Sequence, residues 1–493
     1  MFLLGVLVLA PWGDPRNWFY ARYKLDGGDS DYVESFTSLS LIASVLKGFG
    51  GRSVVLGLDT VGFNRGKPGS YRELVEWARE EYERYLCGVG ASVWILPGTI
   101  YLYRDGLKLS GAVGDYYYTL IARLSLHLFG TERNGAVEEP PEAFAVDLSH
   151  GINYMPVYTL MAAREIAGLS ALVRTAMGVE GRHGMGAVEL RAYNSDPIVR
   201  GPPEARRSPE DPCTPAGRDI EPALLEVHLT EKSVISSSFV VGMADEIFRV
   251  TRDRIRGRAA WNLALRGVNA GEVLSSEERE MLNNALRMSA ILLAFYRLGL
   301  VPELLQYVWE NSGVRSSIAE AIRFVLEKHK GSVIVEGENG EYTLRRALRL
   351  GPGMRLLSYG LAVATATVQA LDNGGGPTLK AVDTLRETLR GSRITYTIQL
   401  REREKLDKAL KIFKNIRHYG RISLAQLYCA QPREYSENVF IRDLIAHGGW
   451  HTDLVELEKN QEGRILIRVN LNETPTRSKS PLTDLIISYI TSS

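Results

Sequence analysis

The sequence predicts an α/β N-terminal half built on a parallel sheet, followed by an all-α C-terminal half that carries a small β insertion. Continuous apolar runs alternate with helical stretches in the first half of the chain. From Ser236 onward apolar residues recur at helical spacing, interrupted by one segment with an Asn-Gly turn. A chain of 493 residues has room for two domains, which we place at 1–234 and 235–493.

Composition narrows the classes of function. Hydrophobic residues make up 45% of the chain and charged residues 24%, as in ordinary globular proteins. The net charge is only +1, so an RNA ligand would bind a local patch and not a polycationic surface. Cys87, Cys213 and Cys429 are odd in number and far apart, so we expect no disulfide framework and no thiolate metal site, which fits a reducing cytoplasm.

The first ten residues are apolar but lack the basic segment of a secretion signal, and a Pro-Trp-Gly-Asp-Pro turn follows at once. We therefore interpret them as a buried strand. No apolar run approaches the ~20 residues of a membrane span.

The N-terminal half alternates strands and helices, which indicates a parallel sheet covered on both sides. The expected buried strands are 3–9, 52–58, 91–96 and 143–148, with further strands at 186–193 and 225–229. The expected helices are 36–46, 71–86, 117–129 and 158–167. Residues 197–222 are rich in proline and charge, and we expect an exposed insertion there.

Open parallel sheets bind ligands beyond the carboxyl ends of their strands. Three loops in that position carry small hydroxyls, amides, free backbone donors and aromatics, a set suited to a nucleotide-like ligand: 11–15, 149–154 and 194–197. No Gly-x-Gly-x-x-Gly follows the first strand, which argues against a dinucleotide cofactor. Residues 62–68 have the wrong spacing for a phosphate-binding P-loop and a proline where Ser or Thr should bind magnesium.

Each of these loop residues also has a purely structural interpretation. Trp12 is either a rim aromatic that covers the sheet edge or a stacking platform for a base. His150 either contacts the ligand or caps the helix that follows it. Asp147 lies within a strand, and its structural interpretation is that its carboxylate only accepts a hydrogen bond from a nearby backbone N–H.

The C-terminal half is predicted to be mostly helical. The expected helices are 243–258, 277–297, 315–329, 354–371, 379–389, 401–419 and 482–490. A hairpin at 332–344 is treated as an insertion, and 464–470 as a terminal strand.

A short helix near the C-terminus holds the most informative residues. Arg442 and His447 lie just before Gly448 and Gly449, and a glycine pair is a common way to end a helix. Five residues turn a helix by roughly 140°, so the two side chains do not stack on one face. Arg grips phosphate oxygens and His exchanges protons near neutral pH, which suits phosphodiester cleavage in RNA.

Similar spacings elsewhere carry less weight. Arg323 and His329 are six residues apart, without a polar neighbour beside the arginine or a glycine stop. His447 and His451 have the four-residue spacing of metal ligands, but the glycine pair interrupts the helix between them, so we expect no metal site.

Basic residues recur along the expected helix 401–419, and Glu402 and Glu404 lie among them. We interpret this helix face as solvated and ion-paired, not as an RNA surface. Asp443 either orients Arg442 or lies in solvent, and the sequence leaves this open.

Two sets of motifs resemble a known family. The segment 442–449 resembles the signature of HEPN ribonucleases, and 146–155 together with 11–15 and 193–197 looks like a CARF domain. The whole chain is similar to the CRISPR-associated CARF–HEPN accessory ribonucleases of type III systems, with the two motif sets in the right order. The likeness is thinnest over 197–222 and 330–377.

This resemblance implies a Rossmann-like CARF domain followed by a helical HEPN domain, in a cytoplasmic homodimer that can associate further. It implies a cyclic-oligoadenylate activator, with cyclic tetra-adenylate expected. Binding of the activator would switch on metal-independent cleavage of single-stranded RNA in antiviral defence. No cofactor, no membrane and no DNA partner are expected. The catalytic residues would be Arg442 and His447. The ligand-binding residues would be Trp12, Gly13, Asp14, Thr37, Ser38, Ser149, His150, Gly151, Asn153, Asn194 and Ser195.

Two alternatives stay open at this level. In one alternative, the protein is a catalytically silent nucleotide sensor that binds RNA or a protein partner. In the other alternative, the N-terminal domain degrades its own ligand, and Ser149 and His150 are the candidate residues for that reaction.

Overall fold

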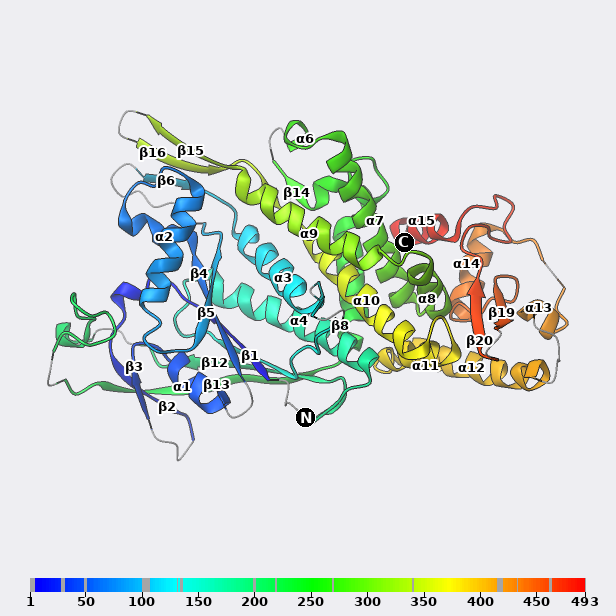
Figure 1. Ribbon diagram of the computed structural model, residues 1–493, viewed down its shortest axis with the longest axis horizontal. Coiled ribbons are helices and arrows are strands. Elements are labelled where there is room, and N and C mark those ends of the chain that lie inside the picture. Colours follow the sequence, from blue (N-terminus) through cyan, green and yellow to red (C-terminus); the bar gives the residue numbers. More distant parts are fainter. Residues whose placement is uncertain are drawn as a thin grey trace.

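Figure 1 shows a computed structural model of the chain, in which a sheet-based half and a helical half lie side by side along the longest axis. The structure describes residues 5–27, 32–47, 51–99, 107–130, 132–133, 136–197, 201–217, 220–267, 270–338, 341–414, 420–431, 433–460 and 463–492.

The main sheet of the described residues has eight strands in the order β3-β2-β13-β12-β9-β1-β4-β5. The five strands from β12 to β5 are parallel, which confirms the predicted parallel sheet. β13 runs antiparallel to β12 and parallel to β2, and neither its length nor its direction was expected. The bounds are β1 Val6–Pro11, β2 Ala21–Leu25, β3 Val33–Ser35, β4 Arg52–Leu58, β5 Ala91–Leu96, β9 Ala143–Asp147, β12 Val188–Ser195 and β13 Ala223–Ile235.

Strand β1 lies in the centre and is buried on both faces, as its unbroken apolar run predicts. Leu7 and Leu9 belong to the core shared with the helical half, whereas Val6, Val8 and Ala10 face a second core on the other side. The flanking helices are α1 Leu39–Lys47, α2 Tyr71–Arg84, α3 Val113–Phe129 and α4 Tyr154–Met177.

Helices α3 and α4 join the two halves. Both pack against α10 (Gly353–Gly374), whose residues are nearly all buried. The other long helices are α5 Ser238–Ile255, α7 Ser276–Leu298, α8 Val301–Glu310, α9 Val314–Gly331, α11 Leu379–Thr388, α12 Arg393–Lys414, α14 Glu437–Ala446 and α15 Leu482–Ser492. The sequence patterns predicted all of these except α8, and among the described residues none is long and apolar enough to cross a membrane.

The smaller elements complete the fold. β18 Arg421–Ser423, β19 Val455–Lys459 and β20 Ile465–Val469 form a three-stranded sheet where only one terminal strand was expected. The short helices are η1 Pro15–Asn17, η2 Asp59–Arg65, η3 Pro203–Ala205, η4 Ala260–Leu263, α6 Ala270–Val273 and α13 Leu424–Leu427. The short strands are β7 Glu132–Arg133, β8 Ala136–Val137, β10 Glu180–Gly181, β11 Gly184–Met185, β14 Leu265–Arg266 and β17 Arg349–Leu350.

The predicted hairpin is present as β15 (Val333–Glu338) and β16 (Glu341–Arg346), and its turn lies outside the described residues. It does not stand alone within the helical half, because β16 pairs in parallel with β6 (Leu107–Ser110) of the N-terminal half. At the end of β16 the Arg346 guanidinium forms an ion pair with Asp59, and both side chains are 0% exposed. The hairpin therefore ties the two halves together.

The expectation that the cysteines form no disulfide framework is wrong for one pair. Cys87 and Cys213 form a disulfide, with Cα atoms 5.1 Å apart, and Cys429 is free. Residues 126 apart in sequence are brought together by the fold, which spacing cannot show. The insertion expected at 197–222 is also only partly exposed, because Arg207 is buried and its guanidinium lies over the rings of Phe36 and Tyr85.

Candidate functional sites

Helix α14 ends as its sequence predicts. His447 is the C-terminal capping residue, and Gly448 and Gly449 have φ angles of +56° and +86°. The φ of Gly449 favours glycine, and a Cβ atom there would also lie 1.9 Å from a carboxylate oxygen of Glu303. The turn leaves His447 half-buried at the end of the helix.

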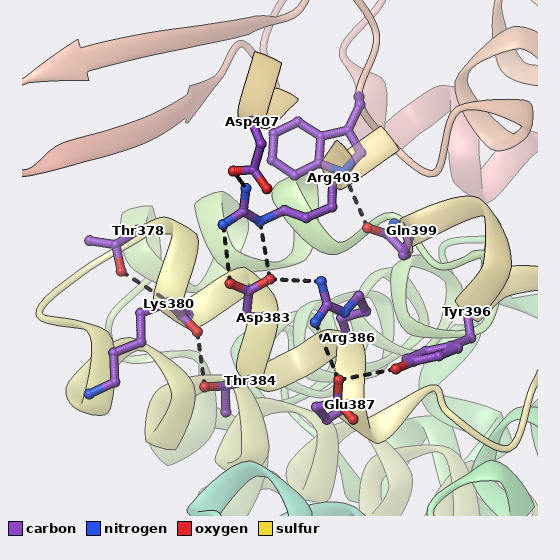
Figure 2. Close-up of polar contacts among 12 residues, drawn as sticks. Thr378, Lys380, Asp383, Thr384, Arg386, Glu387, Tyr396, Gln399, Arg403 and Asp407 are labelled. Carbon is purple, nitrogen blue, oxygen red and sulfur yellow. Dashed lines mark hydrogen bonds and ion pairs between the residues drawn. The ribbon is translucent and has the colours of Figure 1, made fainter. Parts of the chain in front are cut away.

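Helix α12 holds this glycine turn in place through Gln399, which is shown with its neighbours in Figure 2. The Gln399 side-chain amide donates to the carbonyl of Gly448 over 2.7 Å and accepts from the Trp450 indole over 3.2 Å. Arg401 donates to the carbonyl of Ala446 over 3.0 Å, a favourable place for a cation at the end of a helix.

A second set of contacts in Figure 2 anchors α12 to α11. Asp383 on α11 accepts from Arg403 on α12 over 3.1 Å and from Arg386 on its own helix over 2.8 Å. Arg403 also pairs with Asp407 one turn further along α12. These contacts keep α12 in register with the glycine turn.

Glu402 is the functional candidate that sequence reasoning missed. Its side chain is 6% exposed, and one carboxylate oxygen lies 3.2 Å from His447 Nδ1. Lys405 donates to both oxygens of the same carboxylate over 3.0 and 3.2 Å. The expected ion pairs along this helix are present, but Glu402 is buried and faces His447, so the helix is not simply a solvated face.

Asp443 lies between two histidines. Its carboxylate oxygens are 3.6 Å from His447 Nε2 and 3.2 Å from His451 Nε2. The Asp443 side chain is 40% exposed, so the solvent alternative holds in part, and its carboxylate faces the two histidines and not Arg442. The glycine pair bends the chain so that both histidines converge on Asp443, although they do not share a helix face.

His451 is held in one tautomer. The backbone N–H of Asp453 donates to its Nδ1 over 3.2 Å, which leaves the ring hydrogen on Nε2, toward Asp443. Burial lowers the pKa of His451. The lowered pKa favours the neutral ring, whose Nε2 lies 3.2 Å from the Asp443 carboxylate without a hydrogen bond to a described residue.

These side chains line one cavity of about 450 Å³. Its remaining walls come from α12, from the end of α13 and from the segment that precedes β19. The lining residues are Glu402, Lys405, Lys408, Ala409, Leu427, Tyr428, Asp443, His447, Trp450, His451 and Thr452.

Arg442 is placed differently from His447. It is exposed, it does not line the cavity, and no hydrogen bond or ion pair engages its guanidinium within the part of the chain that the structure describes.

The other Arg–His pair with a similar spacing, Arg323 and His329, has structural contacts. Arg323 donates to the carbonyl of Gly130 over 2.9 Å, and His329 is buried. The end of the basic stretch, 415–419, lies outside the described residues.

The second candidate site is the carboxyl edge of the main sheet, where the structure brings the predicted loops together. Asp147, at the end of β9, is buried and accepts from the hydroxyl of Ser38 over 2.8 Å and from the hydroxyl of Ser149 over 2.6 Å. Ser149 Oγ in turn accepts from the backbone N–H of Ser195 over 3.0 Å. Asp147 thus organises three loops, a larger role than satisfying one backbone donor.

His150 connects further parts of this edge. Its carbonyl accepts from the N–H of Gly13 over 2.8 Å, and its Nε2 accepts from the N–H of Ser38 over 3.3 Å. Burial lowers the pKa of His150 to about 4 against the opposing charge of Asp147, so the ring is neutral. It therefore caps the start of α1, and the expectation that it caps the following helix is wrong.

Trp12 is neither a rim aromatic nor an available stacking platform, because its side chain is 0% exposed. It packs edge-on against Trp18, with 4.9 Å between the two ring centroids. The ring centroids of Trp18 and His150 are 4.3 Å apart. Trp18 is half-buried beside the loops, and sequence reasoning did not single it out.

The other predicted residues differ in accessibility. Asn153, with a φ of +38°, and Asn194 are exposed, and Asp14 is half-buried and paired with Arg16. Thr37 and Ser38 are buried, with hydroxyls already bonded inside the protein. The Cβ of a larger residue at Gly13 would lie 2.6 Å from Ile152, so this loop needs glycine.

One group of side chains at this edge has the donors of a cation site. The ligand atoms of Asp26, Glu226 and His228 lie within 4.8 Å of one another, and the two acidic residues are exposed. Both nitrogens of His228 are already engaged, with Asp26 at 2.9 Å and Asp196 at 3.0 Å. The two carboxylates therefore occupy both ring nitrogens of His228, and these hydrogen bonds raise its pKa.

Comparisons with known proteins agree with this geometry. Residues 7–197 match the family model described as "CRISPR system endoribonuclease Csx1, CARF domain". The CRISPR system endoribonuclease Csx1 of Methanocaldococcus jannaschii is 26% identical over 255 residues, which span 50% of this chain and 44% of that protein. The open parallel sheet, with its polar loops at the carboxyl edge, is a CARF domain. The chain therefore contains a CARF domain like that of the Csx1 proteins, and the likeness to the Methanocaldococcus jannaschii protein spans half of this chain.

Proposed function

We propose that this protein is a metal-independent endoribonuclease that cleaves single-stranded RNA and is activated by a cyclic oligoadenylate in type III CRISPR defence. The observation that carries the proposal is the position of His447, at a cavity wall with its Nδ1 3.2 Å from the buried Glu402 carboxylate. The name of the Methanocaldococcus jannaschii relative, an endoribonuclease, supports the same activity.

The tautomer of His447 follows from its partner. An ionised carboxylate can only accept, so Nδ1 carries the hydrogen toward Glu402. Nε2 lies 3.6 Å from the Asp443 carboxylate, beyond hydrogen-bond distance, and is the nitrogen that would accept a proton from the substrate. As a base, Nε2 takes the proton of an RNA 2′-hydroxyl, whose oxygen attacks the adjacent phosphorus. The bond to the 5′-oxygen breaks, that oxygen takes up a proton from water, and the imidazolium of His447 returns its proton to the solvent. The products are a 2′,3′-cyclic phosphate and a 5′-hydroxyl. Glu402 stabilises the imidazolium form that arises during the reaction.

Arg442 supports a composite site made by two copies of the chain. It is exposed and lies outside the cavity that holds His447. In a HEPN-type dimer the helices α14 of the two copies face each other, and the guanidinium of Arg442 offsets charge on the phosphorane. The lysines at the cavity, Lys405 and Lys408, attract the RNA backbone.

The CARF loops would bind the activator, most simply cyclic tetra-adenylate across the two-fold axis of the dimer. In the active form of the dimer the two His447 side chains would face each other. A ligand that binds this form more tightly would shift the population toward it. Degradation of the ligand by Ser149 and His150 is not favoured, because the Ser149 hydroxyl donates to Asp147 and His150 Nε2 accepts from a backbone N–H.

The test uses single-stranded RNA with EDTA present, with and without cyclic tetra-adenylate. We expect cleavage only with the ring, and a loss of at least about 100-fold in the His447→Ala variant, as for removal of a general acid–base group. That variant should still bind the ring. Cleavage that requires magnesium or ignores the ring contradicts the proposal, and a wild-type protein that binds the ring but leaves RNA intact establishes the silent sensor instead.

A further inference from the structure

A second large cavity, of about 410 Å³, lies where the two halves of the molecule meet. We call it the junction pocket. Its walls come from α2, β5 and α3 of the CARF half and from α9 of the helical half, which packs against α3 (Figure 1). The lining residues are Tyr71, Val75, Arg79, Trp94, Ile95, Pro97, Thr119, Arg123, Leu126, Arg323, Leu326, Glu327, His329 and Lys330.

The charge of the junction pocket is strongly one-sided. Among the residues that the structure describes, Arg79, Arg123, Arg323 and Lys330 line it together with one carboxylate, Glu327, which is already paired with Lys330 at 2.7 Å. Burial, together with the like charge of Arg79, lowers the pKa of Arg123 to about 10. Cations gathered in this way around a cavity attract an anionic ligand, because an anion removes their mutual repulsion.

Two of these arginines are held in different ways. Arg123 lies over the indole of Trp94, 4.6 Å from the ring centroid, and donates to the carbonyl of Ile95 over 3.0 Å. Its planar group is therefore oriented before any ligand arrives. Arg79 is exposed on α2, lines the pocket and has no hydrogen bond or ion pair to a described residue, so its donors are free for a ligand.

The buried wall has polar atoms that await a partner. Thr119 is 6% exposed and His329 3%, and neither Thr119 Oγ1 nor His329 Nε2 has a hydrogen-bond partner among the described residues. The nearest carboxylate oxygen to that nitrogen, on Asp115, is 3.7 Å away. Buried polar groups in native proteins are normally satisfied, so these two atoms indicate a ligand with polar groups on this side.

We propose that the junction pocket binds a nucleoside monophosphate. The phosphate lies between the guanidinium groups of Arg79 and Arg123, which supply charge-assisted hydrogen bonds. The nucleoside fills the apolar part of the cavity, within reach of Thr119 and His329. The volume is within the range of pockets for small ligands, and a bound molecule would contact α9 and α2 together, joining the helical half to the CARF half.

The test is calorimetric titration of the full chain with adenosine monophosphate, adenosine and inorganic phosphate. We expect the monophosphate to bind, adenosine to bind far more weakly, and phosphate to bind at least about tenfold more weakly than the monophosphate. Binding of phosphate and the monophosphate with equal affinity would overturn the assignment to a nucleotide, and no binding of any probe would overturn the site.

Matched variants locate the binding. Arg79→Gln should weaken binding of the monophosphate about tenfold, whereas Arg72→Gln, on the same helix and 89% exposed, should not. Arg79 is exposed, so its replacement leaves packing intact. If instead Ser149→Ala abolishes the binding and Arg79→Gln leaves it unchanged, the ligand occupies the CARF loops and the proposal is wrong. RNA cleavage plays no part in this readout, so its success or failure is separate from that of the ribonuclease assignment.

Discussion

His447 Nδ1 and a carboxylate oxygen of Glu402 lie 3.2 Å apart, although the two residues are 45 positions apart in sequence. One comes from the glycine-terminated end of α14 and the other from the middle of α12. Gln399 and Arg401, on the same helix as Glu402, hold the glycine turn by its carbonyls. The relationship makes Glu402 a positioning residue for the imidazole in the proposed ribonuclease.

Replacing Glu402 should therefore slow RNA cleavage without weakening RNA binding. In Glu402→Gln the neutral amide no longer favours the hydrogen on Nδ1 of His447 or stabilises the imidazolium form, so we expect kcat to fall by about 10- to 100-fold with KM nearly unchanged. Steady-state kinetics on a short RNA measures both constants. Glu404→Gln, an exposed neighbour on the same helix, is the control. A rise in KM with kcat unchanged would show that Glu402 acts in binding instead.

Activator binding should depend on Asp147. In Asp147→Asn one amide hydrogen faces a serine hydroxyl that formerly donated, so the contacts that join the loops of Ser38 and Ser149 are lost in part. We expect cyclic tetra-adenylate to bind about tenfold more weakly or worse, as measured by titration calorimetry. Asp253→Asn changes a carboxylate that is 88% exposed on α5 and should bind the ring as the wild type does. Equal affinities for the two variants would remove Asp147 from the ligand site.

The ion pair of Arg346 and Asp59 should contribute strongly to stability. In Arg346→Met the Asp59 carboxylate stays buried without its charge partner, and such a loss typically costs about 3–5 kcal/mol in the free energy of unfolding. Denaturant unfolding measures the change, and Arg349→Met, at an exposed site nearby, is the control. The double variant Asp59→Asn/Arg346→Met should be less destabilised than Arg346→Met, because it leaves no buried charge. A single variant as stable as the wild type would refute this account of the contact between the halves.

Glu303 should make stability depend on pH. Burial raises its pKa from 4.5 to about 8, and neither carboxylate oxygen has a hydrogen-bond partner among the described residues. The folded protein therefore holds a proton that the unfolded chain releases near pH 4.5, so the contribution to stability is full below pH 4.5 and is lost as pH rises to about 8. The total loss is on the order of a few kcal/mol.

The variant Glu303→Gln removes this titration. We expect it to be more stable than the wild type at pH 9 and similar to it at acidic pH, as measured by denaturant unfolding across the range. Glu320→Gln, an exposed carboxylate on α9, should follow the wild-type curve. Parallel curves for Glu303→Gln and the wild type would mean that Glu303 is not protonated in the folded state.

Much of the secondary structure was predictable because it depends on local patterns. The bounds of β4 and β5 agree with the apolar runs, and the glycine pair ends α14 where its lack of side chains allows a left-handed turn. The predicted loops also meet, because the carboxyl ends of parallel strands lie at one edge. The failures are non-local: the partner of Cys87, the burial of Trp12 and the pairing of β16 with β6.

By itself, then, the sequence determined the kinds of element and their order, and it pointed to His447 and to the loops at the sheet edge. It could do so because periodicity, turn chemistry and short motifs act over a few residues. Only the tertiary structure decided that Glu402 faces His447, that Asp147 joins three loops, and that basic residues of α2, α3 and α9 surround one pocket. These are contacts between helices and strands far apart in the chain, and their geometry arises when apolar faces pack, a step that no local pattern records.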